Sequence, residues 1–141
     1  MANALRNTAA DQSGNRCEYC QLTGLFQVRG FEADHIIPRS CGGTTTPSNI
    51  AYACPLCNGR KRNYQDGRDP QTGKMVTLFN PRRDVWHDHF EWSVDARFML
   101  IGKTPCGRAT IARLAMNDTE MLRLRSLLAE AGYDCRKTDF D

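Results

Sequence analysis

The chain has 141 residues, of which 40% are apolar and 25% charged, and its mean hydropathy is −0.56. This composition is ordinary for a globular protein, and the length fits one domain or one core with an appendage. No stretch approaches the roughly 20 consecutive apolar residues of a membrane span, and residues 1–14 lack the apolar segment of a secretion signal. We therefore expect a cytoplasmic protein with no membrane segment.

The net charge of +3 is too small to indicate a nucleic-acid partner by itself, but the basic residues are unevenly distributed. Residues 60–83 hold seven basic and two acidic residues, a net charge of +5. Such a basic stripe suits a phosphate backbone, although a solvated charged surface explains it equally well. The candidate nucleic-acid-binding residues are Arg60, Lys61, Arg62, Arg82 and Arg83.

The first half of the chain predicts two strands behind a polar arm. Residues 1–16 indicate a loose arm or a short helix. A strand is expected over 27–37, closed by Pro38, and a loop rich in glycine and threonine follows over 40–48. A second, short strand is expected over 50–53.

A helix follows, with Pro55 at an early helical position, and runs to about Tyr64. Thr104 and Asp118 are suitable N-cap residues for two further helices, and Gly132 ends the last of them. The pattern therefore predicts, in order after the first helix, a turn-rich segment over 66–73, strands over 75–79 and 93–101, and helices over 105–116 and 118–131.

Two C-x-x-C pairs account for four of the seven cysteines. Cys17 with Cys20, and Cys54 with Cys57, are spaced so that a tight turn directs two thiolates at one ion. In a cytosolic protein, paired cysteines bind metal more often than they form disulfides. We predict a structural Zn²⁺ site in which all four ligands are protein thiolates; unrelated free thiols or disulfides are the alternative. The remaining cysteines have no partner at metal-binding spacing and are read as ordinary residues: Cys41, Cys106 and Cys135.

Other polar residues lie between the two cysteine pairs and directly after the second one. Asp34 and His35 end the first strand, Asn49 opens the second, and Asn58 directly follows Cys57. Phosphodiester hydrolysis needs a base for water, which a neutral histidine provides, and a cation that neutralises charge on the phosphoryl and leaving oxygens. Carboxylate and amide oxygens suit Mg²⁺ or Mn²⁺. Neighbouring residues on a strand face opposite sides, so Asp34 and His35 act together only where the strand ends or becomes irregular.

Several short motifs combine these residues. Between Cys17 and Lys61 the chain reads C-E-Y-C, A-D-H-I-I-P-R, G-G-T-T-T-P-S-N-I and C-P-L-C-N-G-R-K, and this combination resembles the HNH endonuclease family. The later motifs L-F-N-P-R, W-H-D-H-F and G-R-A-T resemble the extension of small bacterial HNH proteins. The resemblance implies an α+β fold: a zinc-stapled ββα-metal core over 17–65, preceded by an arm over 1–16 and followed over 66–141 by an extension of short strands and two helices.

The resemblance also implies a role for each matching position. His35 corresponds to the general base, Asp34 to a metal ligand, and Asn49 to the residue that braces the loop and positions the base. Asn58 corresponds to the second metal ligand, where the family name has histidine. This chain is therefore an HNN variant, and its neutral amide ligand favours Mg²⁺ or Mn²⁺ over Zn²⁺ or Ni²⁺. Asn58 could instead hydrogen-bond the backbone of the cysteine turn.

The other two histidines, His87 and His89, are two residues apart, which on a strand puts both on one face. His89 is an additional candidate metal ligand that could replace the missing motif histidine. Packing or phosphate contact among the neighbouring aromatic residues is the alternative.

Together these features predict a metal-dependent endonuclease that hydrolyses DNA, with RNA left open as a substrate. One active site per chain implies nicking, by a monomer or a homodimer. The rival hypothesis is a non-catalytic zinc module that binds nucleic acid or a protein. Such a module keeps the cysteines and the basic stripe but has no use for Asp34 and His35.

Overall fold

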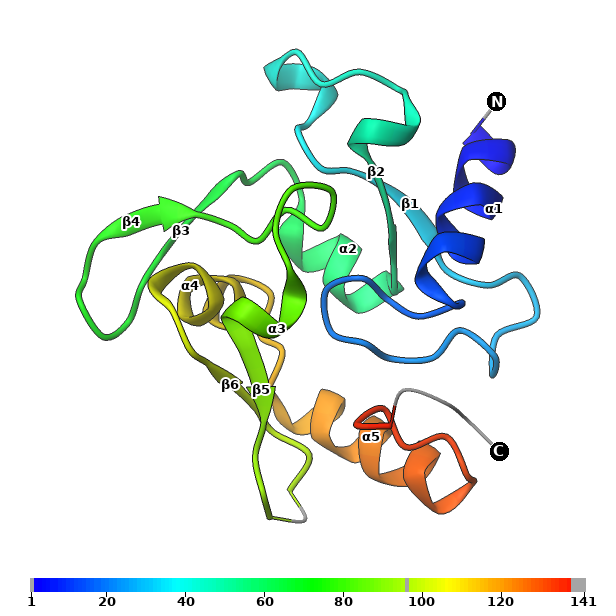
Figure 1. Ribbon diagram of the computed structural model, residues 1–141, viewed down its shortest axis with the longest axis vertical. Helices are drawn as coiled ribbons and strands as arrows, with labels where there is room; N and C mark the ends of the chain where they lie inside the picture. The colour runs from blue at the N-terminus through cyan, green and yellow to red at the C-terminus, as the bar shows by residue number, and fades with distance from the viewer. Residues whose placement is uncertain (1, 96, 138–141) are drawn as a thin grey trace.

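The structure is a computed structural model that describes residues 2–95 and 97–137 (Figure 1). It has the α+β architecture predicted from the sequence, with small two-stranded antiparallel sheets in the described part. The helices are α1 (Ala2–Ser13), α2 (Pro55–Lys61), α3 (Trp86–His89), α4 (Pro105–Arg113) and α5 (Thr119–Glu130). The strands are β1 (Glu32–His35), β2 (Ile50–Ala53), β3 (Asp66–Arg68), β4 (Met75–Thr77), β5 (Phe90–Trp92) and β6 (Leu100–Gly102).

The β1–β2 hairpin and helix α2 form the predicted ββα unit. His35 pairs with Ile50 and Asp34 with Ala51 in the antiparallel register. Strand β2 is buried along its whole length, and Cys54 leads directly from it into α2, where the Cys54 thiol accepts a hydrogen bond from the Cys57 amide at 3.4 Å. This capping bond, with proline at the first helical position, fixes the start of the helix.

Helix α1 packs against the β1–β2 hairpin (Figure 1), so residues 1–16 contain a helix rather than a loose arm. The expected strand over 27–37 is shorter than predicted. Hydrogen bonds from Gln27 N to Gly24 O and from Gly30 N to Gln27 O close turns, and Gly30 has φ 72°. Only Glu32–His35 therefore pairs with β2.

The segment after α2 differs from the predictions in three places. Residues 66–73 contain strand β3, which pairs with β4, so the prediction of turns alone was wrong. Of the expected strand over 93–101, only the end is a strand, as part of β6, and Ser93 N donates to Met99 O next to the β5–β6 pairing. His87 and His89 lie in helix α3 rather than on a strand. The predicted helices near 105–116 and 118–131 are present as α4 and α5.

The G-R-A-T motif begins at a glycine that the packing requires. A Cβ at Gly107 would lie 2.1 Å from the His89 carbonyl oxygen, well inside van der Waals contact, so only glycine lets α4 approach α3 this closely. Arg108, the next residue, forms a bidentate ion pair with the buried Asp69 at 2.9 Å for both bonds. The motif therefore joins α4 to the β3–β4 hairpin and to α3.

Helix α5 and the segment after it pack against the ββα unit. Arg60 of α2 pairs with Asp118, the N-cap residue of α5. Arg16, next to the first cysteine pair, donates to the carbonyl of Cys135 at 3.0 Å. These contacts bring the C-terminal part of the chain beside the core, as Figure 1 shows. No helix among residues 2–95 and 97–137 is long and apolar enough to cross a membrane.

Candidate metal centre and active site

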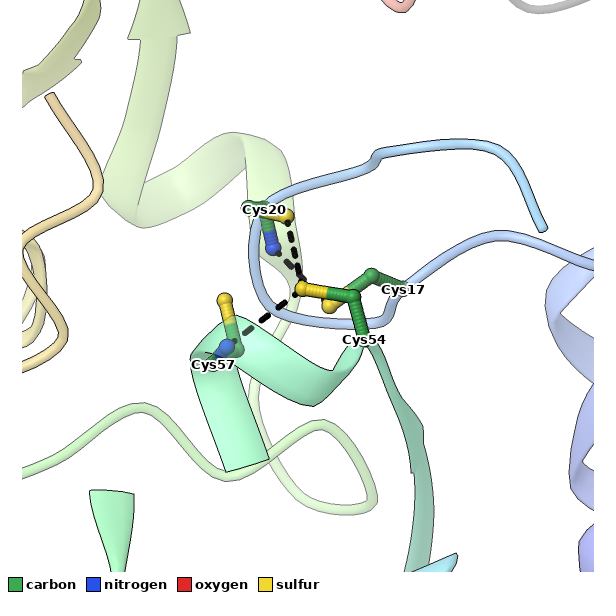
Figure 2. Close-up of side chains that lie close together, drawn as sticks. All are labelled: Cys17, Cys20, Cys54 and Cys57. Carbon is green, nitrogen blue, oxygen red and sulfur yellow. Dashed lines mark hydrogen bonds between the residues drawn. The ribbon is translucent and has the colours of Figure 1, made fainter. Parts of the chain in front are cut away.

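The four predicted zinc ligands come together in one buried cluster. Cys17 and Cys20 lie on the loop after α1, and Cys54 and Cys57 lie at the start of α2, so the two pairs face each other (Figure 2). All four sulfur atoms are within 4.8 Å of one another, and Cys20 Sγ is 3.8 Å from Cys54 Sγ. Zinc–sulfur bonds of about 2.3 Å at tetrahedral angles place sulfur atoms roughly 3.8 Å apart. The cluster is compatible with a zinc site.

The electrostatics of this cluster favour a bound cation. Hydrogen bonds with the Cys17, Cys54 and Cys57 thiols hold the pKa of Cys20 well below its ordinary value, and the nearby charge of Arg125 lowers it further. Hydrogen bonding with Cys17 and Cys20 raises the pKa of Cys57 well above its ordinary value. Arg125 is fully buried on α5. One thiolate is thus favoured at the expense of the others, and a divalent cation would let all four ionise.

Asp34 lies at the floor of the candidate active site, where it is only 4% exposed. Its carboxylate accepts hydrogen bonds from the Tyr19 hydroxyl at 2.6 Å, through Oδ2, and from Lys61 Nζ at 3.3 Å, through Oδ1. Burial raises the pKa of Asp34, and the charge of Lys61 opposes that rise. Tyr19 sits inside the first cysteine turn, so the zinc cluster and the carboxylate are linked through this residue.

Lys61 was predicted to contact flanking phosphates, and that prediction was wrong. The side chain is 1% exposed. Its ammonium group donates to Asp34 and also to the backbone carbonyls of His35 and Ile36, both at 3.1 Å. All three donors are used inside the protein. Lys61 therefore holds the end of β1 against α2 rather than facing solvent.

His35 ends β1 and is partly exposed on the open side of the hairpin. Its Nε2 atom lies 2.9 Å from Thr45 Oγ1. If Nε2 carries the proton and donates to Thr45, Nδ1 is left with a free lone pair, which is the form a general base requires. Thr45 was missed in the sequence because it lies in a run of three threonines that resembles ordinary loop chemistry.

Asn49 braces the loop between β1 and β2. Its Oδ1 accepts from Ile37 N at 2.9 Å, and its Nδ2 donates to Ile37 O and Thr44 O at 3.0 and 2.9 Å. The side chain is largely buried, and its oxygen and nitrogen are both bonded to the loop backbone. Asn49 is therefore placed to brace the loop and not to contact a metal ion. The bracing holds the strand that carries His35 against the loop that carries Thr45.

Asn58 lies on the first turn of α2 after Cys57. Its Nδ2 donates to Glu32 Oε2 at 2.9 Å. Because the amide nitrogen is used in this way, Oδ1 is free to accept a cation. Glu32 was not predicted to have a role, but its position at the start of β1, beside α2, sets the orientation of the amide.

One cavity of about 440 Å³ contains Asp34, His35 and Asn58 in its lining, so the structure brings these three predicted residues together. Arg62 and Arg39 also line it, and both are exposed. Arg62 follows α2 with φ 50° and ψ −128°, a conformation that favours glycine. A strained backbone position thus coincides with an arginine that lines the cavity. Arg39 was not predicted, because it lies outside the basic stripe.

The other predicted basic residues lie away from this cavity. Arg60 is bound to Asp118 and to the carbonyls of Leu114 and Ala115. Arg82 pairs with Glu18 and is half-buried. Arg83 is exposed, but it is not among the residues that line the His35 cavity. Arg60 and Arg82 thus join elements of the fold, and their contact with phosphate stays a prediction.

His89, the additional candidate ligand, is not among the residues that line the cavity of His35. It lies instead beside Asp84 and Cys106, with one potential ligand atom of each within 4.8 Å of the others. Cys106 had been read as an ordinary residue. The three residues are separated by 5 and 17 positions in the chain, a spacing that matches no metal-binding motif, so only the fold reveals this cluster.

The β1–β2 hairpin is followed directly by helix α2, and one cysteine pair precedes the hairpin while the other begins the helix. This arrangement is a ββα core with a four-cysteine cluster that is compatible with zinc. Residues 17–64, about a third of the chain, match the model of the HNH endonuclease family. The matched segment spans both cysteine pairs and Asp34, His35, Asn49 and Asn58, and it is an HNH domain. No curated protein and no solved structure matched the chain.

Proposed function

We propose that this protein is a metal-dependent endonuclease that hydrolyses phosphodiester bonds of DNA, with His35 as the general base. The observation that carries the proposal is the shared cavity of Asp34, His35 and Asn58, which lies over the hairpin and α2 of the HNH domain. A base and two oxygen ligands that face one open cavity are what metal-assisted hydrolysis requires.

The residues present fit a hard divalent cation such as Mg²⁺ or Mn²⁺. Asp34 offers a carboxylate at the cavity floor, and Asn58 offers the amide oxygen that Glu32 leaves free. Both are oxygen donors, and the cavity has room for water to complete the coordination. A cation held there would neutralise charge on the phosphoryl oxygen and on the leaving 3′ oxygen.

His35 takes a proton from the attacking water in this proposal. In this mechanism Nε2 donates to Thr45, which leaves the Nδ1 lone pair to accept the proton, and Asn49 holds the loop that carries Thr45. Water then attacks phosphorus in line with the departing 3′ oxygen. The products carry 5′-phosphate and 3′-hydroxyl ends.

Tyr19 and Lys61 hold the Asp34 carboxylate in place through hydrogen bonds inside the protein. Tyr19 donates to Oδ2 and Lys61 to Oδ1, each oxygen can accept a further bond, and the Lys61 charge opposes the rise that burial causes in the Asp34 pKa and so favours the ionised form that a metal ligand needs. Arg62 and Arg39, on the cavity rim, are placed for the phosphates that flank the scissile bond. The four-cysteine cluster, with zinc bound, holds α2 and the Tyr19 turn in place and has no position left for water.

The proposal is tested by incubating the purified, zinc-loaded protein with supercoiled plasmid in the presence of Mg²⁺, Mn²⁺ or EDTA. We expect nicked circles with either metal and none with EDTA, because one active site cuts one strand at a time. End labelling should find 5′-phosphates. Binding of DNA that depends on zinc, with no cleavage under Mg²⁺ or Mn²⁺ on plasmid or RNA, would instead support a non-catalytic zinc module.

A further inference from the structure

A second group of metal-ligating side chains lies outside the HNH domain. Asp84 precedes α3, His89 ends it, and Cys106 lies on the first turn of α4. One oxygen, nitrogen or sulfur atom of each lies within 4.8 Å of the other two. Tetrahedral zinc with bonds of about 2.0–2.3 Å spaces its ligand atoms roughly 3.3–3.8 Å apart. The ligand atoms of the three side chains therefore need to approach one another by at most about 1–1.5 Å to hold one ion.

The ring of His89 is held by a hydrogen bond at one of its two nitrogens. His89 Nδ1 lies 2.7 Å from Thr104 Oγ1, and the same hydroxyl accepts a hydrogen bond from the Gly107 amide at 3.0 Å as the cap of α4. This leaves Nε2 as the free ring nitrogen. Metal-bound histidines commonly donate their other N–H in this way, which fixes the ring and raises its basicity.

The carboxylate and the thiol are also prepared for a cation. Asp84 Oδ2 accepts from the Asn80 amide at 2.9 Å, and its nearest cation is the exposed Arg83, 4.0 Å away. Such a long, exposed ion pair is worth little, so an ion can replace it. Burial, followed by the charge of Asp84, raises the pKa of Cys106 to about 11. A carboxylate and a thiol side by side, with only this weak pair to the exposed Arg83, are surroundings that a divalent ion relieves.

We propose that Asp84, His89 and Cys106 form a second metal site, which takes Zn²⁺ or a similar borderline ion. A mixed set of thiolate, imidazole and carboxylate ligands suits zinc and discriminates against Mg²⁺ and Ca²⁺, which prefer oxygen alone. The three ligands border a cavity of about 330 Å³, so the fourth position is open to water or a small anion. With zinc bound, the site ties α3 to α4 at the base of the β5–β6 hairpin.

The test counts zinc in the full-length protein. The chain is loaded with excess Zn²⁺, freed of loosely bound metal by gel filtration, and analysed for zinc by mass spectrometry. We expect two equivalents per chain, one in the four-cysteine cluster and one here. Cys106→Ala and Asp84→Asn should each retain one equivalent. Asp84→Asn keeps a side-chain oxygen that can accept the hydrogen bond from the backbone amide of Asn80. Loss of zinc from this variant therefore does not reflect unfolding of the turn over residues 80–84.

Two variants serve as controls. Cys41→Ala removes an exposed thiol that belongs to neither cluster and should retain two equivalents. His35→Ala should also retain two, which separates this site from the proposed nuclease site and keeps the outcome independent of nuclease activity. Titration with Zn²⁺ should show the Kd of the second equivalent rising more than about 100-fold in Cys106→Ala, beyond the 10–100-fold typical of outer-shell changes. A single equivalent in the unmodified protein, or two equivalents that survive both ligand substitutions, would overturn the proposal.

Discussion

Replacement of Lys61 by methionine should destabilise the protein strongly, because it leaves a buried charge alone. Lys61 Nζ lies 3.2 Å from Asp34, and the two side chains are only 2% and 4% exposed. At that distance and an effective dielectric constant of about 20, the attraction is roughly 5 kcal/mol. Removing one partner of such a pair typically costs about 3–5 kcal/mol, and two backbone carbonyls also lose their donor.

The cost of Lys61→Met should depend on pH in a defined direction. The pKa of Asp34 is already raised in the folded protein, by burial, and losing Lys61 raises it further. The folded state then binds the Asp34 proton more tightly than the unfolded state does. Asp34 therefore contributes its full share of stability below its unfolded pKa and loses it as pH rises through the folded pKa. The destabilisation should be largest at neutral pH and smaller in mild acid.

The assay is urea unfolding of the zinc-loaded proteins. Asp34→Asn combined with Lys61→Met should recover part of the lost stability, because no charge stays buried and the asparagine oxygen still accepts from Tyr19. Lys74→Met, which removes an exposed lysine, is the matched control and should change stability by less than about 0.5 kcal/mol. The reasoning is refuted if Lys61→Met falls within about 1 kcal/mol of the unmodified protein, or if adding Asp34→Asn recovers nothing.

Three further predictions concern the metal cluster and the cavity. Cys57→Ser, or a zinc chelator, should unfold the HNH segment, because a structural zinc contributes about 10–16 kcal/mol of apparent binding energy. The circular dichroism signal should be lost as zinc is released, and a native spectrum without zinc would contradict this. Thr45→Val should lower kcat for nicking about 10–100-fold with little change in KM, and Thr45→Ser should restore it; an unchanged kcat would remove Thr45 from the site. Arg62→Gly should raise the free energy of unfolding by about 1 kcal/mol, because glycine relieves the backbone strain at φ 50°. The same change should weaken DNA binding, because it removes the arginine side chain. A loss of both stability and binding would mean that Arg62 is not strained.

The cysteine cluster and the hairpin–helix unit were predictable because their signals are local. Two C-x-x-C pairs specify a shared ion through spacing alone, and the proline after Cys54 marks where α2 begins. The shared cavity of Asp34, His35 and Asn58 followed from the motif in combination. His35 and Asn58 are 23 positions apart, and their meeting depends on the hairpin bringing β1 beside α2.

Lys61 shows why the burial of a basic residue is hard to predict from the sequence. In a helix, residues three, four and seven positions apart share a face, so Cys54, Cys57 and Lys61 fall on the same buried side. Asn58 and Arg62, four positions apart, fall on the side that borders the cavity. The spacing alone does not separate the two sides, because Asn58 is also four positions after Cys54 and three before Lys61; the structure is what places Lys61 in the core and Arg62 at the cavity.

Other features could not be predicted because they depend on contacts between distant segments. Asp84, His89 and Cys106 are united only when α4 packs against α3 across Gly107. Arg60 and Arg82 gain their partners from elements 58 and 64 residues away in the chain. No local pattern encodes such pairings, and a basic residue in the sequence looks the same whether its partner is a phosphate or a buried carboxylate.

The most direct test of the central claim is the single-turnover rate of plasmid nicking by His35→Ala, compared with the unmodified protein at equal zinc content. General base catalysis by a positioned side chain contributes about 10²–10⁴-fold. The rate should fall by that factor while the fold, the zinc content and DNA binding stay unchanged. A rate within a few-fold of the unmodified protein would show that His35 is not the base and that the proposed mechanism is wrong.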